Sequence, residues 1–237
     1  TVVSEAGSAY TWVENAHEFR LTTWHNDPVA DPASEVLYLR DDETGDVWCP
    51  TPAPLRSEAS YTVRHSAGVS SFTHRRSDVE TLLTVGIAPD EPVKLSILRA
   101  TNRGDRPRRL SLTSYDEWAL GTLREHTQHQ VRTEIDAEST AILARNSFNP
   151  DFASRVAFSA ISGPVTSHTG DRRGFLGRNG TASHPAAMRS SEPLDGVTGA
   201  ALDPWAALGW VIALEPGERR EVDFQVEGPL LTLAPLA

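Results

Sequence analysis

Cysteine and lysine are almost absent from this sequence. Cys49 is the one cysteine and Lys94 the one lysine among 237 residues. A single cysteine cannot form a disulfide within the chain, and we expect Cys49 to be a small buried apolar residue. With one lysine, nearly all positive charge is carried by arginine, whose planar guanidinium makes paired hydrogen bonds to carboxylates or polyhydroxylated ligands.

Long apolar runs are also missing. The longest, PWAALGWVIAL at 204–214, is shorter than the roughly 20 apolar residues that a membrane-spanning helix needs. The 22 Lys plus Arg against 32 Asp plus Glu give a net charge of −10, which disfavours nucleic acid and anionic lipid surfaces. We predict no nucleic-acid partner and no direct membrane insertion. The chain begins at Thr1 without a signal-peptide pattern, and we expect it to be part of a longer protein.

Most of the sequence shows the pattern of β-strands: apolar and polar residues alternate in short stretches that are separated by polar turns. These stretches lie at 34–50, 60–65, 69–76, 79–88, 92–120, 130–146 and 210–226. The first and last predict hairpins, which turn at 43–46 and at Pro216-Gly217. Roughly ten to fourteen short strands with few or no helices predict an all-β fold, an antiparallel sandwich.

Two stretches, 10–32 and 163–203, break this rhythm, and long irregular loops on a β scaffold are either functional or disordered. The first contains Tyr10, Trp12 and Trp24 among carboxylates, amides and guanidinium groups. Aromatic faces next to planar hydrogen-bonding groups are typical of carbohydrate sites. Tryptophans that plug the end of a sandwich, with polar groups capping turns, would show the same residue types. The residues alone leave both interpretations open.

Other patterns that carry chemistry are weak. The eight histidines show no HxH or HExxH spacing and no GxSxG is present, so we predict no metal and no cofactor. Asp116-Glu117 lies at a strand end beside Trp118, where a carboxylate could contact a sugar, although such pairs are more often structural. We expect the glycine-rich stretch FLGRNG at 175–180 to present Arg178 to a polar ligand or a neighbouring domain.

Six long motifs occur in order along residues 1–228. They are SEAGSAYTWVENAHEFRLTTWHNDPVADP, EVLYLRDDETGDVWCPTPAP, NRGDRPRRLSLTSYDEWALG, ILARNSFNPDFASRVAF, FLGRNGT and ALDPWAALGWVIALEPGERREVDF. Together they resemble the phosphorylase region of bacterial cyclic β-1,2-glucan synthases. They are similar, more distantly, to the cellobiose and chitobiose phosphorylases of glycoside hydrolase family 94.

The resemblance implies a fold, and it implies that catalysis takes place in another domain. It implies an antiparallel β-supersandwich of the galactose-mutarotase type over residues 1–228, followed by a tail at 229–237 that diverges from the family. Catalysis in that family belongs to a separate (α/α)6 barrel, so no catalytic residue carries over to this chain. Loops of the sandwich contribute to the mouth of the active site. By this resemblance a sugar-accepting subsite would be lined by Trp12, Glu14, Arg20, Trp24, Asn26, Asp27 and Arg178.

We therefore expect a non-catalytic carbohydrate-binding and assembly domain of a glucan-active phosphorylase or glucan synthase. Its partners would be a β-glucan oligosaccharide and a catalytic barrel or second subunit, with a homodimer as the expected assembly. We expect a cytoplasmic location, either free or on the cytoplasmic side of the inner membrane as part of a larger synthase. Two alternatives stay open: a stand-alone lectin-like module, and a mutarotase-like enzyme that uses a His and a Glu as acid and base.

Overall fold

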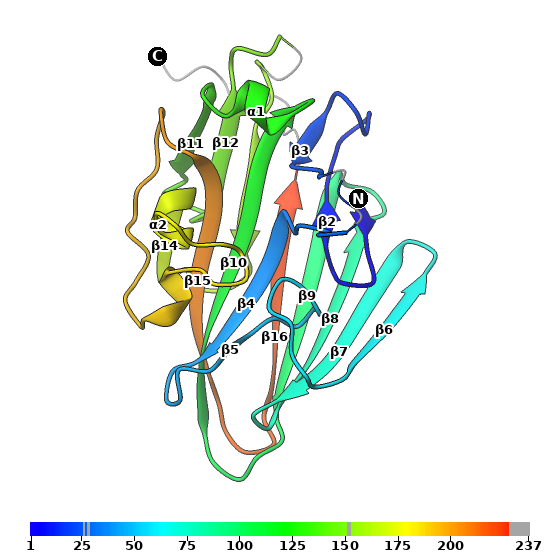
Figure 1. Ribbon diagram of the computed structural model, residues 1–237, viewed down its shortest axis with the longest axis vertical. Coiled ribbons are helices and arrows are strands. Elements are labelled where there is room, and N and C mark those ends of the chain that lie inside the picture. The colour runs from blue at the N-terminus through cyan, green and yellow to red at the C-terminus, as the bar shows by residue number, and fades with distance from the viewer. Residues whose placement is uncertain (26, 28, 151–152, 228–237) are drawn as a thin grey trace.

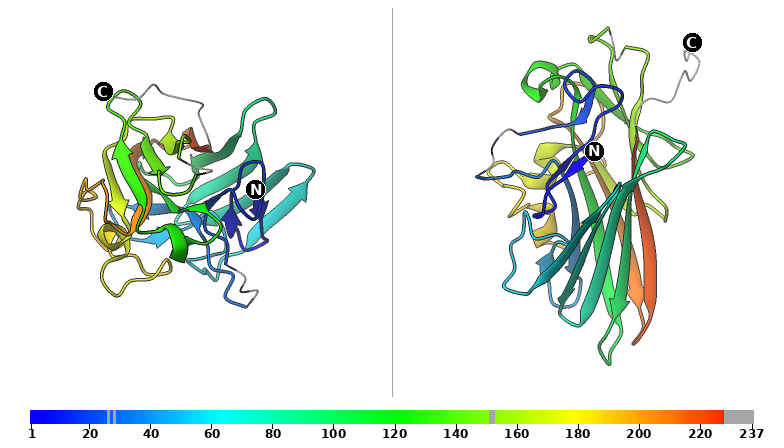
Figure 2. Two further views of the ribbon diagram at one scale, coloured as in Figure 1. Left: turned by 90° about the horizontal axis from the view of Figure 1, so that it is seen from above. Right: turned by 90° about the vertical axis from the view of Figure 1, so that its right-hand side faces the viewer.

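The computed structural model describes residues 1–25, 27, 29–150 and 153–227 of the protein. Two antiparallel sheets face each other, as the views in Figures 1 and 2 show. The larger sheet has eight strands, in the order β11 (Val131–Ile135), β12 (Ile142–Asn146), β13 (Ala157–Ile161), β16 (Arg219–Glu227), β9 (Val93–Asn102), β8 (Val79–Ile87), β7 (Val69–Arg76) and β6 (Tyr61–Ser66).

The smaller sheet has six strands, with β10 at its centre. Its order is β14 (Ser167–Asp171), β15 (Pro204–Leu214), β10 (Arg108–Gly121), β4 (Glu35–Asp41) and β5 (Val47–Trp48), and β3 (Arg20–Thr22) pairs with the end of β10. A separate two-stranded sheet joins β1 (Val2–Val3) and β2 (Ala9–Tyr10). This architecture confirms the predicted all-β antiparallel sandwich. The described residues form 16 strands, against a predicted ten to fourteen, and the shortest strands account for most of the difference.

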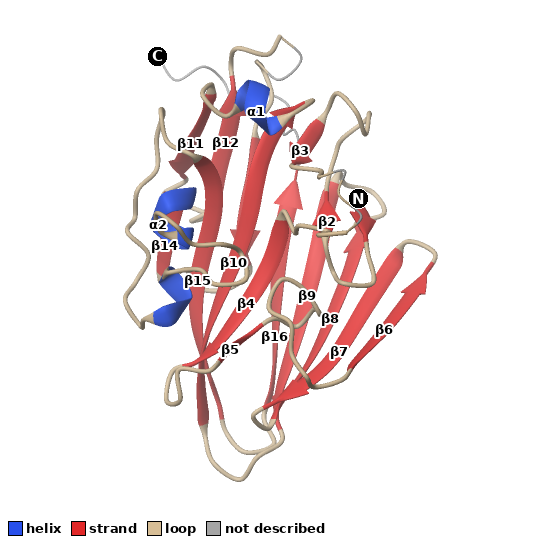
Figure 3. Cartoon of the chain, viewed as in Figure 1, coloured by secondary structure: helices blue, strands red, loops and turns tan. Residues whose placement is uncertain are grey.

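Helices are few and short in the described part of the chain, as Figure 3 shows. They are α1 (Arg124–Thr127), α2 (Arg172–Leu176) and the 3₁₀ helix η1 (Ala187–Arg189). None of the described helices is long and apolar enough to cross a membrane.

The main core lies between the two sheets, where alternate residues of each strand point inward. Along β8, for example, Val79, Thr81, Leu83 and Val85 are buried, and the residues that alternate with them are partly exposed. Alternation of this kind is what a sheet with one packed face requires. Leu98 from the larger sheet and Leu110 from the smaller one meet in the same core.

A second core covers the outer face of the smaller sheet, under the segment 172–203. Tyr38 and Tyr115 project from the sheet, and Phe175 of α2 and Met188 of η1 pack onto them. The stretch 163–203 is therefore neither an open loop nor structureless: it contains β14, α2 and η1, and it forms a lid. Because both faces of β15 are buried, the sequence of this strand is almost continuously apolar.

The hairpin predicted at 210–226 is wrong. Strand β15 pairs with β10 and β14 in the smaller sheet, whereas β16 pairs with β9 and β13 in the larger one. The turn at Pro216-Gly217 is thus a corner that connects the two layers. Turn residues and alternation are the same for a corner and for a hairpin, so the sequence pattern cannot distinguish them. The inward positions of β16, Val222, Phe224 and Val226, were predicted correctly.

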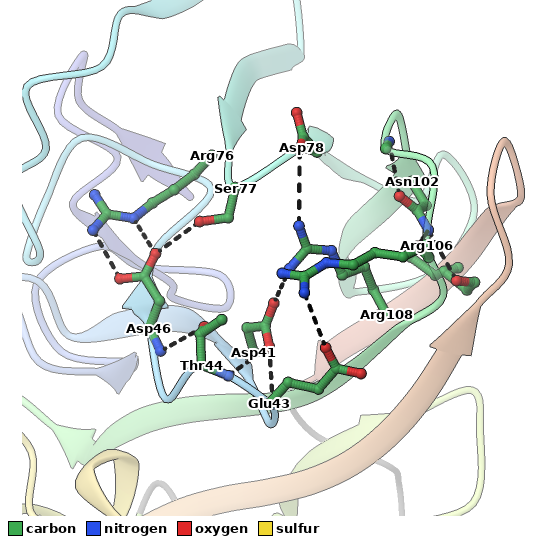
Figure 4. A network of polar contacts seen from close by, with 12 residues as sticks. Asp41, Glu43, Thr44, Asp46, Arg76, Ser77, Asp78, Asn102, Arg106 and Arg108 are labelled. Atoms are coloured by element: carbon green, nitrogen blue, oxygen red, sulfur yellow. Dashed lines mark hydrogen bonds and ion pairs between the residues drawn. The ribbon is translucent and has the colours of Figure 1, made fainter.

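Ion pairs close the end of the sandwich at which the corner at Pro216-Gly217 lies (Figure 4). Arg108 and Asp41 are both buried and lie 2.8 Å apart (Nη1 to Oδ2). Arg76 makes two hydrogen bonds, of 2.7 and 2.8 Å, to Asp46 in the turn after β4. The Arg108–Asp41 pair links β10 to β4 within the smaller sheet, and the Arg76–Asp46 pair joins the β4–β5 turn to β7 of the larger sheet. The paired hydrogen bonds between a guanidinium and a carboxylate fix the orientation of both groups.

The one lysine is buried at the other end of the core. Glu35 on β4 and Asp116 on β10 lie directly opposite each other in neighbouring strands, an arrangement that is unfavourable for two negative charges. Lys94 reaches them from β9 in the facing sheet, makes an ion pair with Glu35 and interacts electrostatically with Asp116. Ser159 donates a hydrogen bond of 2.6 Å to Asp116. Burial lowers the pKa of Lys94 and raises the pKa of Asp116.

We predict that Lys94→Met lowers the free energy of unfolding by about 3–5 kcal/mol, because it leaves two carboxylates buried without a cation. Urea denaturation followed by far-UV circular dichroism measures the change. The matched control is Lys94→Met combined with Glu35→Gln and Asp116→Asn, which removes all three charges and should recover most of the loss. A single variant as stable as the wild type would contradict this assignment.

A second prediction concerns His74, which is buried, stacked on Tyr61 at 3.8 Å between ring centroids, and has its Nδ1 atom 3.3 Å from the Ser60 carbonyl oxygen. Burial lowers the pKa of His74, so the folded state favours the neutral ring. Its contribution to stability is complete above the unfolded pKa of about 6.5 and is lost as the pH falls through the lowered value.

Thermal melts at about pH 7.5 and about pH 5 test whether stability falls on acidification, because the two values bracket the unfolded pKa of histidine. His74→Phe keeps the stacking and removes the titration, so this variant should lose less stability on acidification than the wild type. The matched control, His65→Gln, changes an exposed histidine and should follow the wild type. If the wild type and His74→Phe lose equal stability on acidification, the protonation of His74 does not cause the loss.

Candidate functional site

The opening segment is an ordered turn-and-strand unit, not a free loop. Trp12 pairs with Arg20 in an isolated antiparallel bridge, and the Val13 N–H donates to the Phe19 carbonyl at 3.0 Å. The side chain of Asn15 caps the turn between them by accepting hydrogen bonds from two backbone N–H groups, at 2.8 and 3.1 Å. The Thr23 N–H donates to the Glu117 carbonyl at 3.0 Å, which fixes the segment to the end of β10.

Four side chains of this segment form an aromatic platform. The ring of Tyr10 lies 5.2 Å from that of Trp12 and 5.9 Å from that of Trp24. The guanidinium of Arg20 lies 5.1 Å from the centroid of the Trp24 ring, within the range of a cation–π contact. Arg20 also donates to the carbonyls of Ala16 at 3.0 Å and Thr122 at 2.8 Å. Trp24 is 40% exposed, so one part of its ring is braced and another meets solvent.

A cavity of 300 Å³ opens beside this ring, and we call it the Trp24 pocket. Its other wall is the segment that follows β10, including Thr122, Leu123 and Arg124. A β-bulge between Trp118 and Gly121 bends the strand here. Leu120, within the bulge, has a φ of +43°, a left-handed conformation that costs energy for a branched residue and is often found beside functional sites.

A second cavity of 390 Å³ adjoins the first, and His25 lines both; we call it the Glu117 pocket. Glu117 is 12% exposed and lies 3.0 Å (Oε1 to Nε) from Arg124. His25 approaches the other carboxylate oxygen at 3.7 Å. Arg124 also makes an ion pair with Asp203, and Asp203 lies 3.8 Å from Arg172. Charges of both signs therefore alternate along these side chains. We call them the charged wall, which consists of His25, Glu117, Arg124, Asp203 and Arg172.

Trp205 supports the charged wall from below. It is fully buried, and the guanidinium carbons of Arg124 and Arg172 lie 5.9 and 5.6 Å from its ring centroid. Tyr115 packs edge-on against the same indole at 4.0 Å. Burial, and then the nearby Glu117 charge, raise the pKa of Tyr115, which also hydrogen-bonds Arg172. The two arginines are thus held in fixed orientations toward the pocket.

The structure brings three of the seven predicted site residues, Arg20, Trp24 and Asp27, into the lining of the Trp24 pocket. Trp12 supports the platform from behind, through Tyr10. Asn26 lies outside the described residues. Asp27 forms a local turn by accepting hydrogen bonds from Val29 and Ala30, both at 3.0 Å, and these bonds lower the pKa of its carboxyl group.

The other two predicted residues point elsewhere. Glu14 faces Arg155, with two hydrogen bonds of 3.0 and 3.2 Å. Arg178 is exposed in the turn after α2, and it is Thr181 and Ser183 of the same loop that line the Glu117 pocket. The sugar-binding role of all seven residues stays a prediction.

Sequence reasoning missed most of the charged wall. It weighed Asp116 and Glu117 as one pair, but successive residues of a strand point to opposite faces, so Asp116 enters the core and Glu117 the pocket. It also found no His/Glu pair, whereas the fold places His25 beside Glu117. Arg172 and Asp203 lie at the two ends of the lid, and no short-range pattern in the sequence indicates that they meet.

A family model for the glycosyl hydrolase 94 supersandwich domain matches residues 1–228. The chain belongs to this family. The supersandwich domain is 34% identical over 223 residues to the cyclic beta-(1,2)-glucan synthase NdvB of Rhizobium meliloti (strain 1021), covering 94% of this chain and 8% of that protein. It is 24% identical over 226 residues to the N,N'-diacetylchitobiose phosphorylase of Vibrio furnissii, covering 92% of this chain and 28% of that enzyme.

The supersandwich domain thus spans less than a third of the length of these curated relatives. Among solved structures it is similar to a bacterial glucoamylase complexed with acarbose, with a TM-score of 0.50 at 9% identity, over 95% of this chain and 35% of that one. At this identity the likeness concerns the fold alone. The predicted boundary of the domain at residue 228 stays a prediction, and the tail at 229–237 lies outside the described residues.

Proposed function

We propose that this supersandwich domain is a non-catalytic carbohydrate-binding and assembly domain, which contributes loops to the sugar subsites of a separate (α/α)6 catalytic barrel. The observation that carries the proposal is the exposed face of Trp24, braced by Arg20 and Tyr10 and placed beside the ion-paired Glu117 wall. An apolar ring next to fixed, planar hydrogen-bonding groups matches the two kinds of surface on a sugar. The relatives named for a glucan synthase and a disaccharide phosphorylase support a β-linked oligosaccharide as the ligand.

Three carboxylates in or near the pockets, Asp116, Glu117 and Asp27, are held in ways that favour a binding role over a catalytic one. Asp116 is buried in the core with Lys94, out of reach of a ligand in either pocket. Glu117 is engaged by Arg124, and Asp27 by its own turn. A general acid for glycosidic bond cleavage needs a carboxyl group that is free to give its proton to the leaving oxygen. We therefore assign catalysis to the barrel.

The first test is calorimetric titration of the chain with β-1,2-gluco-oligosaccharides. Trp24→Ala should weaken binding about fivefold, equivalent to about 1 kcal/mol, because it removes the ring on which the sugar stacks. The matched control is Val69→Ala, which truncates an exposed apolar residue in the β6–β7 hairpin. Binding by Trp24→Ala that equals the wild type would show that the platform is not the sugar site.

We propose that the rim of the pockets is covered by a barrel domain or a second subunit. Three exposed apolar residues, Trp24, Val29 and Leu123, lie at or beside the Trp24 pocket. Exposed apolar side chains that gather at one place are typical of interaction surfaces. We expect a homodimer, which light scattering at high protein concentration would detect and Leu123→Ser would weaken. A monomer at all concentrations would contradict the dimer and leave the barrel as the partner.

Two further expectations complete the proposal. The domain would act in the cytoplasm as part of a larger glucan-active protein. It would show no mutarotation of glucose, although His25 and Glu117 lie side by side. A polarimetric assay distinguishes the binding domain from the mutarotase-like alternative, and turnover that His25→Gln abolishes would overturn the non-catalytic assignment.

A further inference from the structure

We infer that the Trp24 pocket and the Glu117 pocket continue into a third pocket, and that the three form one groove for a linear, uncharged oligosaccharide. This inference rests on the proposed function and extends it from a sugar site to an oligosaccharide-length site. The third pocket, of 280 Å³, lies beside Tyr61, and we call it the Tyr61 pocket.

The three pockets are neighbours, because they share lining residues. His25 lines both the Trp24 pocket and the Glu117 pocket. Asp31, Ala53 and Arg56 line both the Glu117 pocket and the Tyr61 pocket. The three cavities, of 300, 390 and 280 Å³, therefore follow one another, with the Glu117 pocket in the middle. Each is near the small end of the range for ligand pockets, so the groove has room for about one sugar ring per pocket.

Each end of the groove has an aromatic ring in a fixed position. At one end, Trp24 is held by Arg20. At the other, Tyr61 is stacked on buried His74 with an angle of 9° between the rings, and its hydroxyl donates to the Cys49 carbonyl at 3.2 Å. Rings that are fixed before a ligand arrives lose little conformational entropy on binding. A ligand that uses both rings must extend through the Glu117 pocket.

The charges along the groove favour an uncharged ligand. The Trp24 pocket is lined by Arg124 and by the carboxylates of Asp27 and Glu125. The Tyr61 pocket is lined by Arg56 and by Asp31, which accepts a hydrogen bond of 2.7 Å from Ser4. Cations and anions thus alternate, and no long stretch of one sign would attract a phosphorylated or acidic polymer. Alternating donors and acceptors suit the hydroxyl groups of a neutral glucan.

The test is a length series, measured by calorimetry on the intact chain with glucose and with β-1,2-linked gluco-oligosaccharides of two to five units. Affinity should rise with each unit until about three rings fill the three pockets, and then level off. Trp24→Ala changes an exposed residue at one end of the groove, and Arg56→Gln changes an exposed residue where the other two pockets meet. Both should weaken binding of the trisaccharide and longer ligands about fivefold, and at least one should leave the shortest ligand unaffected.

Arg132→Gln is the matched control, because it removes an exposed arginine from β11. Binding that is sensitive to Trp24→Ala but shows no length dependence, with Arg56→Gln like the wild type, would overturn the groove and leave the proposed function intact. The absence of binding at every length would instead contradict the proposed function. A preference for acidic over neutral oligosaccharides of equal length would overturn the assignment of an uncharged ligand.

Discussion

Lys94 joins the two layers of the sandwich at the end where the candidate site lies. Glu35 and Asp116 face each other across β4 and β10, and only a cation from the opposite sheet makes that arrangement acceptable inside a core. Glu35 also accepts a hydrogen bond of 2.5 Å from Thr22, whose hydroxyl accepts one of 2.8 Å from the Thr11 N–H. The buried charges therefore fix the opening segment at Thr11 and at Thr22. They also fix the aromatic platform that this segment carries, including Trp24.

The second core gives the site its other wall. The lid over the smaller sheet brings Arg172 and Asp203 to the end of β10, where Glu117 and Arg124 complete a chain of opposite charges. The same strand thus serves two purposes, because its alternate residues face the core and the pocket. Rigid strands, a bulge and a packed lid position the polar groups before any ligand binds, which is the arrangement that selective recognition requires.

Much of this fold could be predicted from the sequence, because alternation and turn residues determine strands locally. The sheet to which each strand belongs could not be predicted in this way, because the corner at Pro216-Gly217 and a true hairpin use the same kinds of residue. Trp24, Arg20 and Asp27 could be predicted to lie together because they share one short segment, and their sugar-binding role stays a prediction. Arg172, Asp203 and His25 depend on how distant segments meet, and the burial of Lys94 depends on register between two sheets.

The opening segment is a rigid part of the sandwich, held through Thr22 and Glu35 by Lys94. Amide hydrogen exchange of the intact chain can measure this rigidity. The N–H groups of Thr11, Val13, Leu21 and Thr23 are hydrogen-bonded and should exchange as slowly as those of β10. In Lys94→Met they should exchange faster, before β10 does. Wild-type exchange at these positions as fast as in the exposed turn at 67–68 would show that the opening segment is not rigid.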